Sequence, residues 1–221
     1  MKTEFNGWTR TVQLSPPSLQ DNTADADRLI ATLRSIFKIN NLHIDYHVLK
    51  VLPRRLREWN FAAKCIVFRD RRRWNLIGIA PPDDHSSIWG VAIDLGTSRV
   101  VLRFIDLDNG KLLGETSFDN PQSAIGPDIL ERIHFTDQAD GLKTLNQLII
   151  AKLNQEIARF CRGYDRTVED VYLISIAGNT AMTHLFLGLE PQWIIREPYI
   201  PVVNRPGVLK SQEIGIKINP A

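Results

Sequence analysis

The residues Ile93-Asp94-Leu95-Gly96-Thr97-Ser98 give the strongest indication of a fold class in this chain. They join two apolar runs, 89–94 and 100–107, which we predict to be strands. Asp108-Asn109-Gly110 then predicts a hairpin turn, because Asn-Gly suits positive φ angles. A third strand is expected over 111–118, so the quoted residues form the first turn of a three-stranded meander.

This turn has the residue types that hold phosphate. Gly96 lacks a side chain, so the backbone can approach phosphate oxygens closely. Successive backbone amides and the hydroxyls of Thr97 and Ser98 can donate hydrogen bonds to those oxygens. Asp94 is placed to hold a water molecule of a Mg²⁺ ion that neutralises them. The alternative is an ordinary hairpin with a capping aspartate, since the pattern is short.

A long helix and a fourth strand are predicted after the meander. Apolar residues recur on one face between Leu142 and Phe160, over about five turns. Residues 171–177 form a continuous apolar strand, as in a sheet covered on both faces. That strand ends at Gly178-Asn179-Thr180, where Asn179 or Thr180 can cap a short helix. The order predicts an α/β unit.

Residues 1–80 predict a small α+β domain. A short strand over 8–15 precedes a helix whose apolar stripe lies within 29–37. A second helical stretch contains Pro53, which either starts a new helix or kinks the old one. Two strands are expected within 64–79, joined by an arginine-rich turn.

The segment Pro81-Pro82-Asp83-Asp84-His85-Ser86-Ser87 is the clearest boundary in the chain. It is polar and rich in residues that interrupt regular structure. We therefore divide the chain into a small α+β domain (1–80), a linker (81–88) and an α/β domain (89–221).

Composition excludes several classes of protein. Hydrophobic residues make up 43% of the chain, which favours packed cores over disorder. A net charge of +2 is too mild to indicate nucleic acid binding. No apolar run reaches the roughly 18 residues of a membrane span, and the N-terminus lacks the apolar core of a signal peptide. Cys65 and Cys161 are isolated, which favours a reducing cytoplasm, and an iron–sulfur cluster normally requires four thiolates.

Several stretches beyond the turn match one family. They are Leu14–Asp25 with Asp27-Arg28-Leu29, Leu52–Arg57, Asn120-Pro121-Gln122, Gly126–Ile133 and, most specific, Gly178–Leu189. With the meander and its turn, they make the chain resemble the reductive activators of corrinoid-dependent methyltransferases. That family lies in the acetate and sugar kinase, heat-shock protein and actin superfamily. The resemblance covers about residues 11–221.

The resemblance implies a fold and a chemistry. The fold is a small α+β middle domain followed by the first (N-terminal) subdomain of an actin-like ATPase fold of the ribonuclease-H type. The activity is ATP-dependent restoration of cob(I)alamin from cob(II)alamin in a corrinoid protein, with ATP and Mg²⁺ as cofactors. Asp94 would be the catalytic residue, holding Mg²⁺ through water. The implied cofactor-binding residues are Gly96, Thr97, Ser98, Gly178, Asn179 and Thr180. For the last three, a plain strand-to-helix turn is the alternative.

The sequence also departs from the family. The ferredoxin cysteines and the second half of the ATPase fold are absent, so no iron–sulfur cluster is expected in this chain. Its own ATP hydrolysis is an open question, and we expect the isolated chain to be nearly inactive. A separate chain would then supply the ferredoxin domain or the second ATPase half. The far face of the sheet would expose apolar residues, which makes self-association an expectation. An inactive truncated gene product is the remaining alternative.

Two basic clusters, 54–57 and 71–73, have two interpretations. They are either solvated surface or a patch that docks a corrinoid protein without turnover. Met182 and His184 suggest contact with cobalt at first sight. A single imidazole without neighbouring ligands does not form a metal site, so we expect His184 to be structural.

Overall fold

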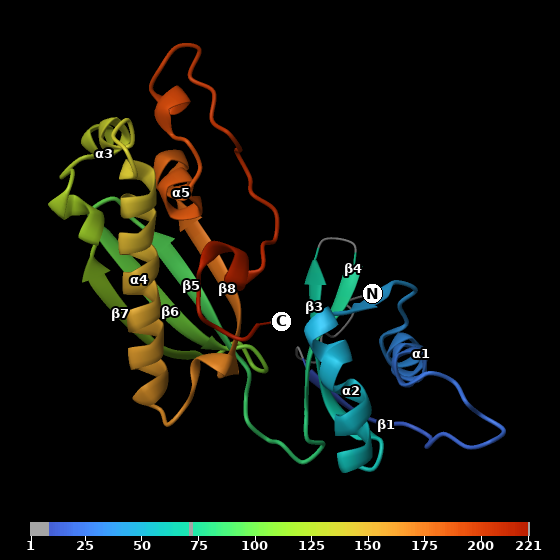
Figure 1. The fold of residues 1–221 in the computed structure, drawn as a ribbon. Coiled ribbons are helices and arrows are strands. Elements are labelled where there is room, and N and C mark those ends of the chain that lie inside the picture. The colour runs from blue at the N-terminus through green and yellow to red at the C-terminus, as the bar shows by residue number, and fades with distance from the viewer. Residues whose placement is uncertain (1–8, 71–72, 221) are drawn as a thin grey trace, which may run out of the picture. The chain divides into compact units, whose positions relative to one another are not determined.

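The computed structural model describes residues 9–70 and 73–220. The chain separates into two compact units. Unit 1 holds the described residues up to Ser87 together with 107–109, and unit 2 holds Ile88–Asp106 and Gly110–Pro220. Each unit has its own sheet and its own hydrophobic core (Figure 1). None of the described helices has the length and hydropathy that a bilayer crossing requires.

The described residues of unit 1 form a four-stranded sheet with two helices. Its strands are β1 (Thr9–Gln13), β2 (Leu42–Ile44), β3 (Ala62–Asp70) and β4 (Arg73–Ala80), in the order β1-β3-β4-β2. β3 is antiparallel to β1 and β4, whereas β2 is parallel to β4. The helices are α1 (Asp25–Phe37) and α2 (Tyr46–Glu58). Leu29 and Leu33 of α1 pack with Leu52 and Leu56 of α2 over Val67 of the sheet.

Helix α2 continues through Pro53. Of the two alternatives for this proline, the start of a new helix is therefore wrong. A proline inside a helix removes one backbone hydrogen bond and crowds the preceding turn. The buried stripe of α2 compensates, because Val48, Leu52 and Leu56 extend on both sides of Pro53 and are at most 1% exposed. Burial of this stripe therefore fixes one continuous helix.

Unit 2 is built on a mixed four-stranded sheet. Its strands are β5 (Trp89–Leu95), β6 (Arg99–Asp106), β7 (Leu112–Asp119) and β8 (Val171–Gly178), in the order β7-β6-β5-β8. β5, β6 and β7 form an antiparallel meander, and β8 pairs with β5 in parallel. The predicted meander, long helix and returning strand are thus all present. The parallel pair places the carboxyl ends of β5 and β8 side by side.

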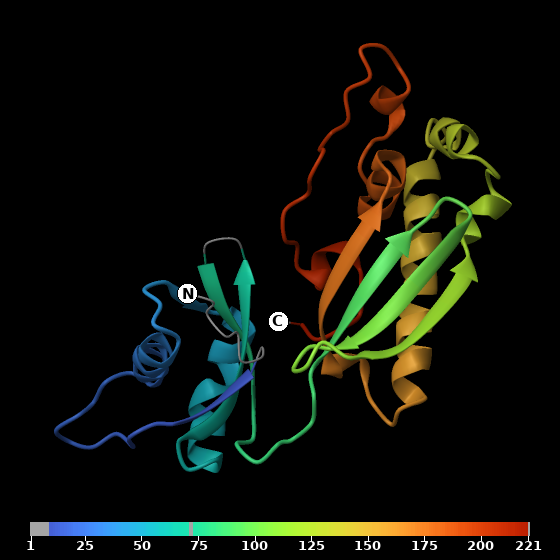
Figure 2. The same cartoon turned by 180° about the vertical axis from the view of Figure 1, so that it is seen from behind.

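One helix, α4 (Gly141–Arg162), covers a face of this sheet (Figure 1). The shorter helices α3 (Ile129–Phe135) and α5 (Thr180–Leu187) pack against α4 and against each other at the end of the sheet. Leu145, Ile149, Leu153 and Ile157 give α4 a continuous buried stripe against the sheet. Figure 2 shows the opposite face, which carries no helix of the described part of unit 2. The core of unit 2 therefore lies between the sheet and α4.

The segment after α5 returns to this core without forming a strand in its described part. Ile216, which follows the 3-10 turn η4 (Ser211–Ile214), is only 2% exposed. Asn154 of α4 donates to the carbonyl of Gly215 at 2.9 Å and accepts from the amide of Lys217 at 2.8 Å. These bonds fasten residues 211–217 to α4.

Candidate phosphate-binding site

The turn between β5 and β6 is closed by a side chain from outside the hairpin. Asn120 Nδ2 donates to the carbonyl oxygen of Gly96 at 2.9 Å. The backbone amide of Asn120 donates to the carbonyl oxygen of Ser98 at 2.8 Å. A Cβ atom at Gly96 would meet the carbonyl oxygen of Arg99. The turn is therefore tight, and it has no room for a side chain at its first position.

Hydrogen-bond donors of the turn are available to a ligand. Within the described part of the chain, the amides of Thr97 and Ser98 form no backbone hydrogen bond. Thr97 Oγ1 accepts from Asn179 Nδ2 at 3.2 Å. Because that bond uses a lone pair of the hydroxyl, the proton of Thr97 is left to donate elsewhere. The Ser98 side chain is exposed. This arrangement suits a phosphate group.

The end of β8 lies directly beside this turn. Gly178 is in register with Leu95, and a Cβ at Gly178 would come within 3.1 Å of the Leu95 carbonyl oxygen. Asn179 is the N-cap of α5, since its Oδ1 accepts from the amide of Met182 at 2.8 Å. The same side chain donates to Thr97 through Nδ2. Asn179 therefore caps α5, as the alternative interpretation expected, and also contacts the turn between β5 and β6. Its role in binding a cofactor stays a prediction.

Asp94 lies on the helix-free face of the sheet. Its neighbours Ile93 and Leu95 are buried in the core, and alternation along the strand turns Asp94 to the other side. The carboxylate is exposed between Val101 of β6 and Ala177 of β8. Asp94 is thus near the carboxyl end of β5, two residues before Gly96, where the turn begins. Its role in holding Mg²⁺ stays a prediction.

Thr180 is exposed at the first position of α5, and its carbonyl accepts from His184 Nδ1 at 2.7 Å. His184 is fully buried, and its Nε2 accepts from the amide of Val202 at 3.0 Å. Since a carbonyl can only accept, the proton of this neutral imidazole is on Nδ1. The described residues contain no group of three His, Cys, Asp or Glu side chains that could hold a metal ion. His184 therefore links α5 to the segment around Val202.

Sequence reasoning missed the buried polar residues that contact the turn or the residues next to it. Asn120 and Gln122 are fully buried in and beside η1 (Pro121–Ala124), and Arg132 of α3 is fully buried as well. All three belong to stretches that carried the family resemblance, Asn120-Pro121-Gln122 and Gly126–Ile133. Their polar side chains, placed within stretches shared with the family, were the feature of the sequence that could have indicated a role near the site. The predicted site residues all come from the turn and the β8 end, which the structure brings together.

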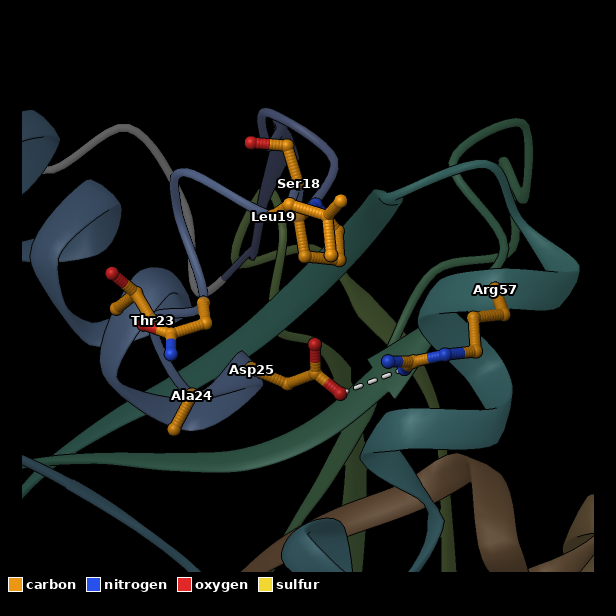
Figure 3. A pocket seen from close by; sticks show the side chains of 8 residues that line it. Ser18, Leu19, Thr23, Ala24, Asp25 and Arg57 are labelled. Carbon is orange, nitrogen blue, oxygen red and sulfur yellow. Dashed lines mark hydrogen bonds and ion pairs between the residues drawn. The ribbon is translucent and has the colours of Figure 1, made fainter.

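Unit 1 contains a separate hollow of about 580 Å³ between the loop before α1 and helix α2. It includes none of the phosphate-site residues. Asp25 and Arg57 meet across it at 2.7 Å (Figure 3), and Leu19 on the loop is 98% exposed. Hydrogen bonds from Arg28 and then Thr23 hold the pKa of Asp21 well below its ordinary value. The loop is therefore fixed by polar contacts while its leucine faces solvent.

The arginines of α2 are partly neutralised. Arg54 and Arg55 both reach Glu58, at 3.5 and 2.9 Å, and Arg57 pairs with Asp25. Together with the exposed Lys50, this surface has four positive groups and two negative ones. Of the second basic cluster, Arg71 and Arg72 lie outside the described residues.

Comparisons with known proteins agree with this architecture. A family model of the RACo linker region matches residues 7–86, and a model of the RACo middle region matches residues 89–221. The corrinoid activation enzyme RamQ of Eubacterium limosum is 31% identical over 147 residues, which cover 66% of this chain and 25% of that protein. A solved structure described as a reductive activator for corrinoid, iron-sulfur protein matches 100% of this chain at 32% identity, with a TM-score of 0.87. This chain spans 35% of that structure.

These matches confirm the fold class expected from the sequence, a small α+β domain followed by the first subdomain of an actin-like ATPase fold. The name middle domain, which the resemblance gave to residues 1–80, is wrong, because the family models apply it to residues 89–221. The family models name unit 1 the linker region and unit 2 the middle region. Because the two models together cover almost every residue, the chain belongs to the RACo family of corrinoid activators.

Proposed function

We propose that this chain supplies the first phosphate-binding element of an ATP-dependent reductive activator, which restores cob(I)alamin from cob(II)alamin in a corrinoid protein. The descriptions of the two relatives support corrinoid activation as the setting. The hydrogen bond from Asn179 to Thr97 is the observation that carries the proposal. It joins the two predicted phosphate-binding segments, which are 82 residues apart in sequence, into one site.

The residues present fit a nucleotide phosphate. Gly96 leaves open a backbone cradle that a Cβ would fill, and the amides of Thr97 and Ser98 are unengaged within the described part of the chain. The N-terminus of α5, beginning at Thr180, adds a positive helix end that favours an anion. ATP, when bound, would supply a phosphoanhydride bond whose hydrolysis releases free energy.

The chain's own contribution is positioning and electrostatics, as is usual in phosphoryl transfer. Gly96, Thr97 and Ser98 bind and orient phosphate oxygens. Asn179 orients the Thr97 hydroxyl toward them. Asp94, near the end of β5, would hold Mg²⁺ through a water molecule, so nucleotide affinity should depend on the metal.

The Asp94→Asn variant tests this proposal. We expect the chain with Asp94 to bind ATP more tightly with Mg²⁺ than with a chelator, because the carboxylate attracts the hydrated ion. In Asp94→Asn this metal dependence should largely disappear, whereas Glu115→Gln, an exposed carboxylate on β7, should retain it. Calorimetric titration with ATP measures all three proteins. The absence of ATP binding, or equal metal dependence in both variants, would refute the proposal.

A second candidate function is docking of a corrinoid protein on unit 1, without turnover. The observation that favours it is the mixed surface beside the hollow of Figure 3. Leu19 is almost fully exposed on a loop fixed by polar bonds, and the neighbouring α2 surface has an excess of positive charge. An acidic protein surface with an apolar recess would complement it.

A further inference from the structure

Arg132 is the largest fully buried side chain among the described residues. Its Nε donates to the carbonyl of Gly126 at 2.7 Å. Nη1 lies 3.5 Å from Gln122 Oε1 and 3.6 Å from Met182 Sδ, which are weak contacts. Nη2 has no hydrogen-bond partner within the described part of the chain. The guanidinium is thus held by one strong bond and two weak ones.

The charge of Arg132 has no partner of opposite sign in contact with it among the described residues. Burial lowers the pKa of Arg132, and the nearby Asp128 only partly offsets this effect through space. Arginine nevertheless stays protonated at neutral pH. Burying a charge without a counter-ion is strongly unfavourable. A buried guanidinium with no acidic partner in contact therefore indicates that an anion outside the described chain balances its charge.

Two short routes connect Arg132 to the phosphate site. The first begins at Gln122, whose backbone amide donates to Asn120 Oδ1 at 3.0 Å. Asn120 in turn donates to the carbonyl oxygen of Gly96 in the turn. The second leads from Met182, whose amide donates to Asn179 Oδ1 at 2.8 Å. Asn179 in turn donates to Thr97. Arg132 is thus connected to both segments of the candidate site through one intervening residue each, Gln122 and Met182, and contacts neither segment directly.

We infer that Arg132 is the positioning residue of the phosphate site and that its buried charge is balanced by a bound polyphosphate. This inference rests on the proposed function. The guanidinium contacts the side chains of Gln122 and Met182 from one side, while the carbonyl of Leu145 accepts from Gln122 Nε2 at 2.9 Å on the other. Through Gln122 and Met182, Arg132 biases the positions of the Asn120 and Asn179 side chains. Its charge also raises the positive potential at the turn. Because the charge is buried, salt screens its effect much less than that of a surface arginine.

Inorganic tripolyphosphate is a suitable probe, because it presents phosphates without requiring an adenosine pocket. The full chain is compared with Arg132→Met, Arg132→Lys and the control Arg103→Met, which removes an exposed arginine of β6. Calorimetry measures affinity at low and high salt. Proton–nitrogen spectra of the free proteins report the side-chain amides of Asn120 and Asn179, a signature of positioning that stability alone does not move.

We expect Arg132→Met to weaken tripolyphosphate binding by about tenfold at both salt concentrations. It should also shift the side-chain amide resonances of Asn120 and Asn179. Arg132→Lys should recover most of the affinity, because it keeps the charge, while the resonances stay shifted, because it lacks the planar fork. Arg103→Met should change affinity only slightly, and only at low salt.

Other outcomes distinguish a failure of the positioning role of Arg132 from a failure of the proposed function. If Arg132→Met lowers the melting temperature but leaves affinity and both resonances unchanged, Arg132 only packs helices and the inference is overturned. If the chain with Arg132 binds no tripolyphosphate, the proposed function fails. The resonances then still decide the positioning role, and unmoved signals overturn it. Should Arg132→Met not fold, Arg132→Lys with unshifted resonances gives the same negative result.

Discussion

Gly96 combines a constraint on the backbone of the turn with a proposed role in binding phosphate. A side chain there would overlap the carbonyl oxygen of Arg99, which is backbone and cannot rotate away. The carbonyls of Gly96 and Ser98 are also fixed by Asn120. A shift at Gly96 would therefore move the neighbouring amides that we expect to hold phosphate.

Gly96→Ala should lower the free energy of unfolding of unit 2 by about 1–3 kcal/mol, because the added methyl overpacks a tight turn. It should also weaken polyphosphate binding. Gly207→Ala is the matched control, since a Cβ there meets nothing within 4 Å, and it should stay within roughly 0.5 kcal/mol. Urea unfolding and calorimetry check both variants. Identical behaviour of the two alanine variants would contradict the geometry of the turn.

The turn between β5 and β6 could be located from the sequence because its signal is local, whereas its binding of phosphate stays a prediction. Glycine followed by two hydroxyl residues at a strand end is a local pattern. Asn120 and Arg132 could not be assigned this way, since their partners are fixed by tertiary packing. Asn120 reaches back 24 residues to Gly96, and Arg132 reaches forward 50 residues to Met182. Such pairs become visible only when the register of the sheet and the helix positions are known.

At the scale of elements, long strands and helices could be recognised from their apolar periodicity, whereas the shortest strand could not. Among the described residues, the seven strands of five residues or more and the long helix α4 carry enough periodicity to be recognised. Strand β2 has only three residues, too few to show alternation, and was missed. For α2, the proline left a new helix start open as an alternative, because the cost of a proline inside a helix is visible in the sequence. Burial of the apolar stripe, which offsets that cost, depends on tertiary packing. The link from α5 to Val202 through His184 likewise depends on packing.

Helix α2 and the loop before α1 carry the proposed docking surface, so its test belongs to these elements. Charge reversal of Arg54, Arg55 and Arg57 to Glu should weaken binding of a corrinoid protein by about tenfold at low salt. The difference should shrink at high salt, since exposed charges are screened. Arg34→Glu, an exposed charge on α1, is the control. Surface plasmon resonance at two salt concentrations measures the effect, and unchanged affinity would exclude this surface.

At the scale of the whole molecule, the two units have separate cores that share no residue. Each core contains one buried cysteine, Cys65 in unit 1 and Cys161 in unit 2. Burial raises the pKa of Cys65 to about 12 and that of Cys161 to about 11, from an ordinary value of 9.0. The stability linked to these protonated thiols is present below pH 9 and is lost as the pH rises toward the folded values.

The two thiols can therefore report the opening of each unit independently, because only the thiolate of an exposed cysteine reacts quickly. Leu52→Ala should destabilise unit 1 and Leu153→Ala unit 2, each by about 2–5 kcal/mol, since both leucines are buried to 1% exposure or less. We expect Leu52→Ala to accelerate labelling of Cys65 alone, and Leu153→Ala that of Cys161 alone. Mass spectrometry of the two cysteine peptides after timed alkylation in mild denaturant distinguishes them. If each variant accelerated both cysteines equally, the units would unfold as one cooperative body, because a local loss in either core would then open the other.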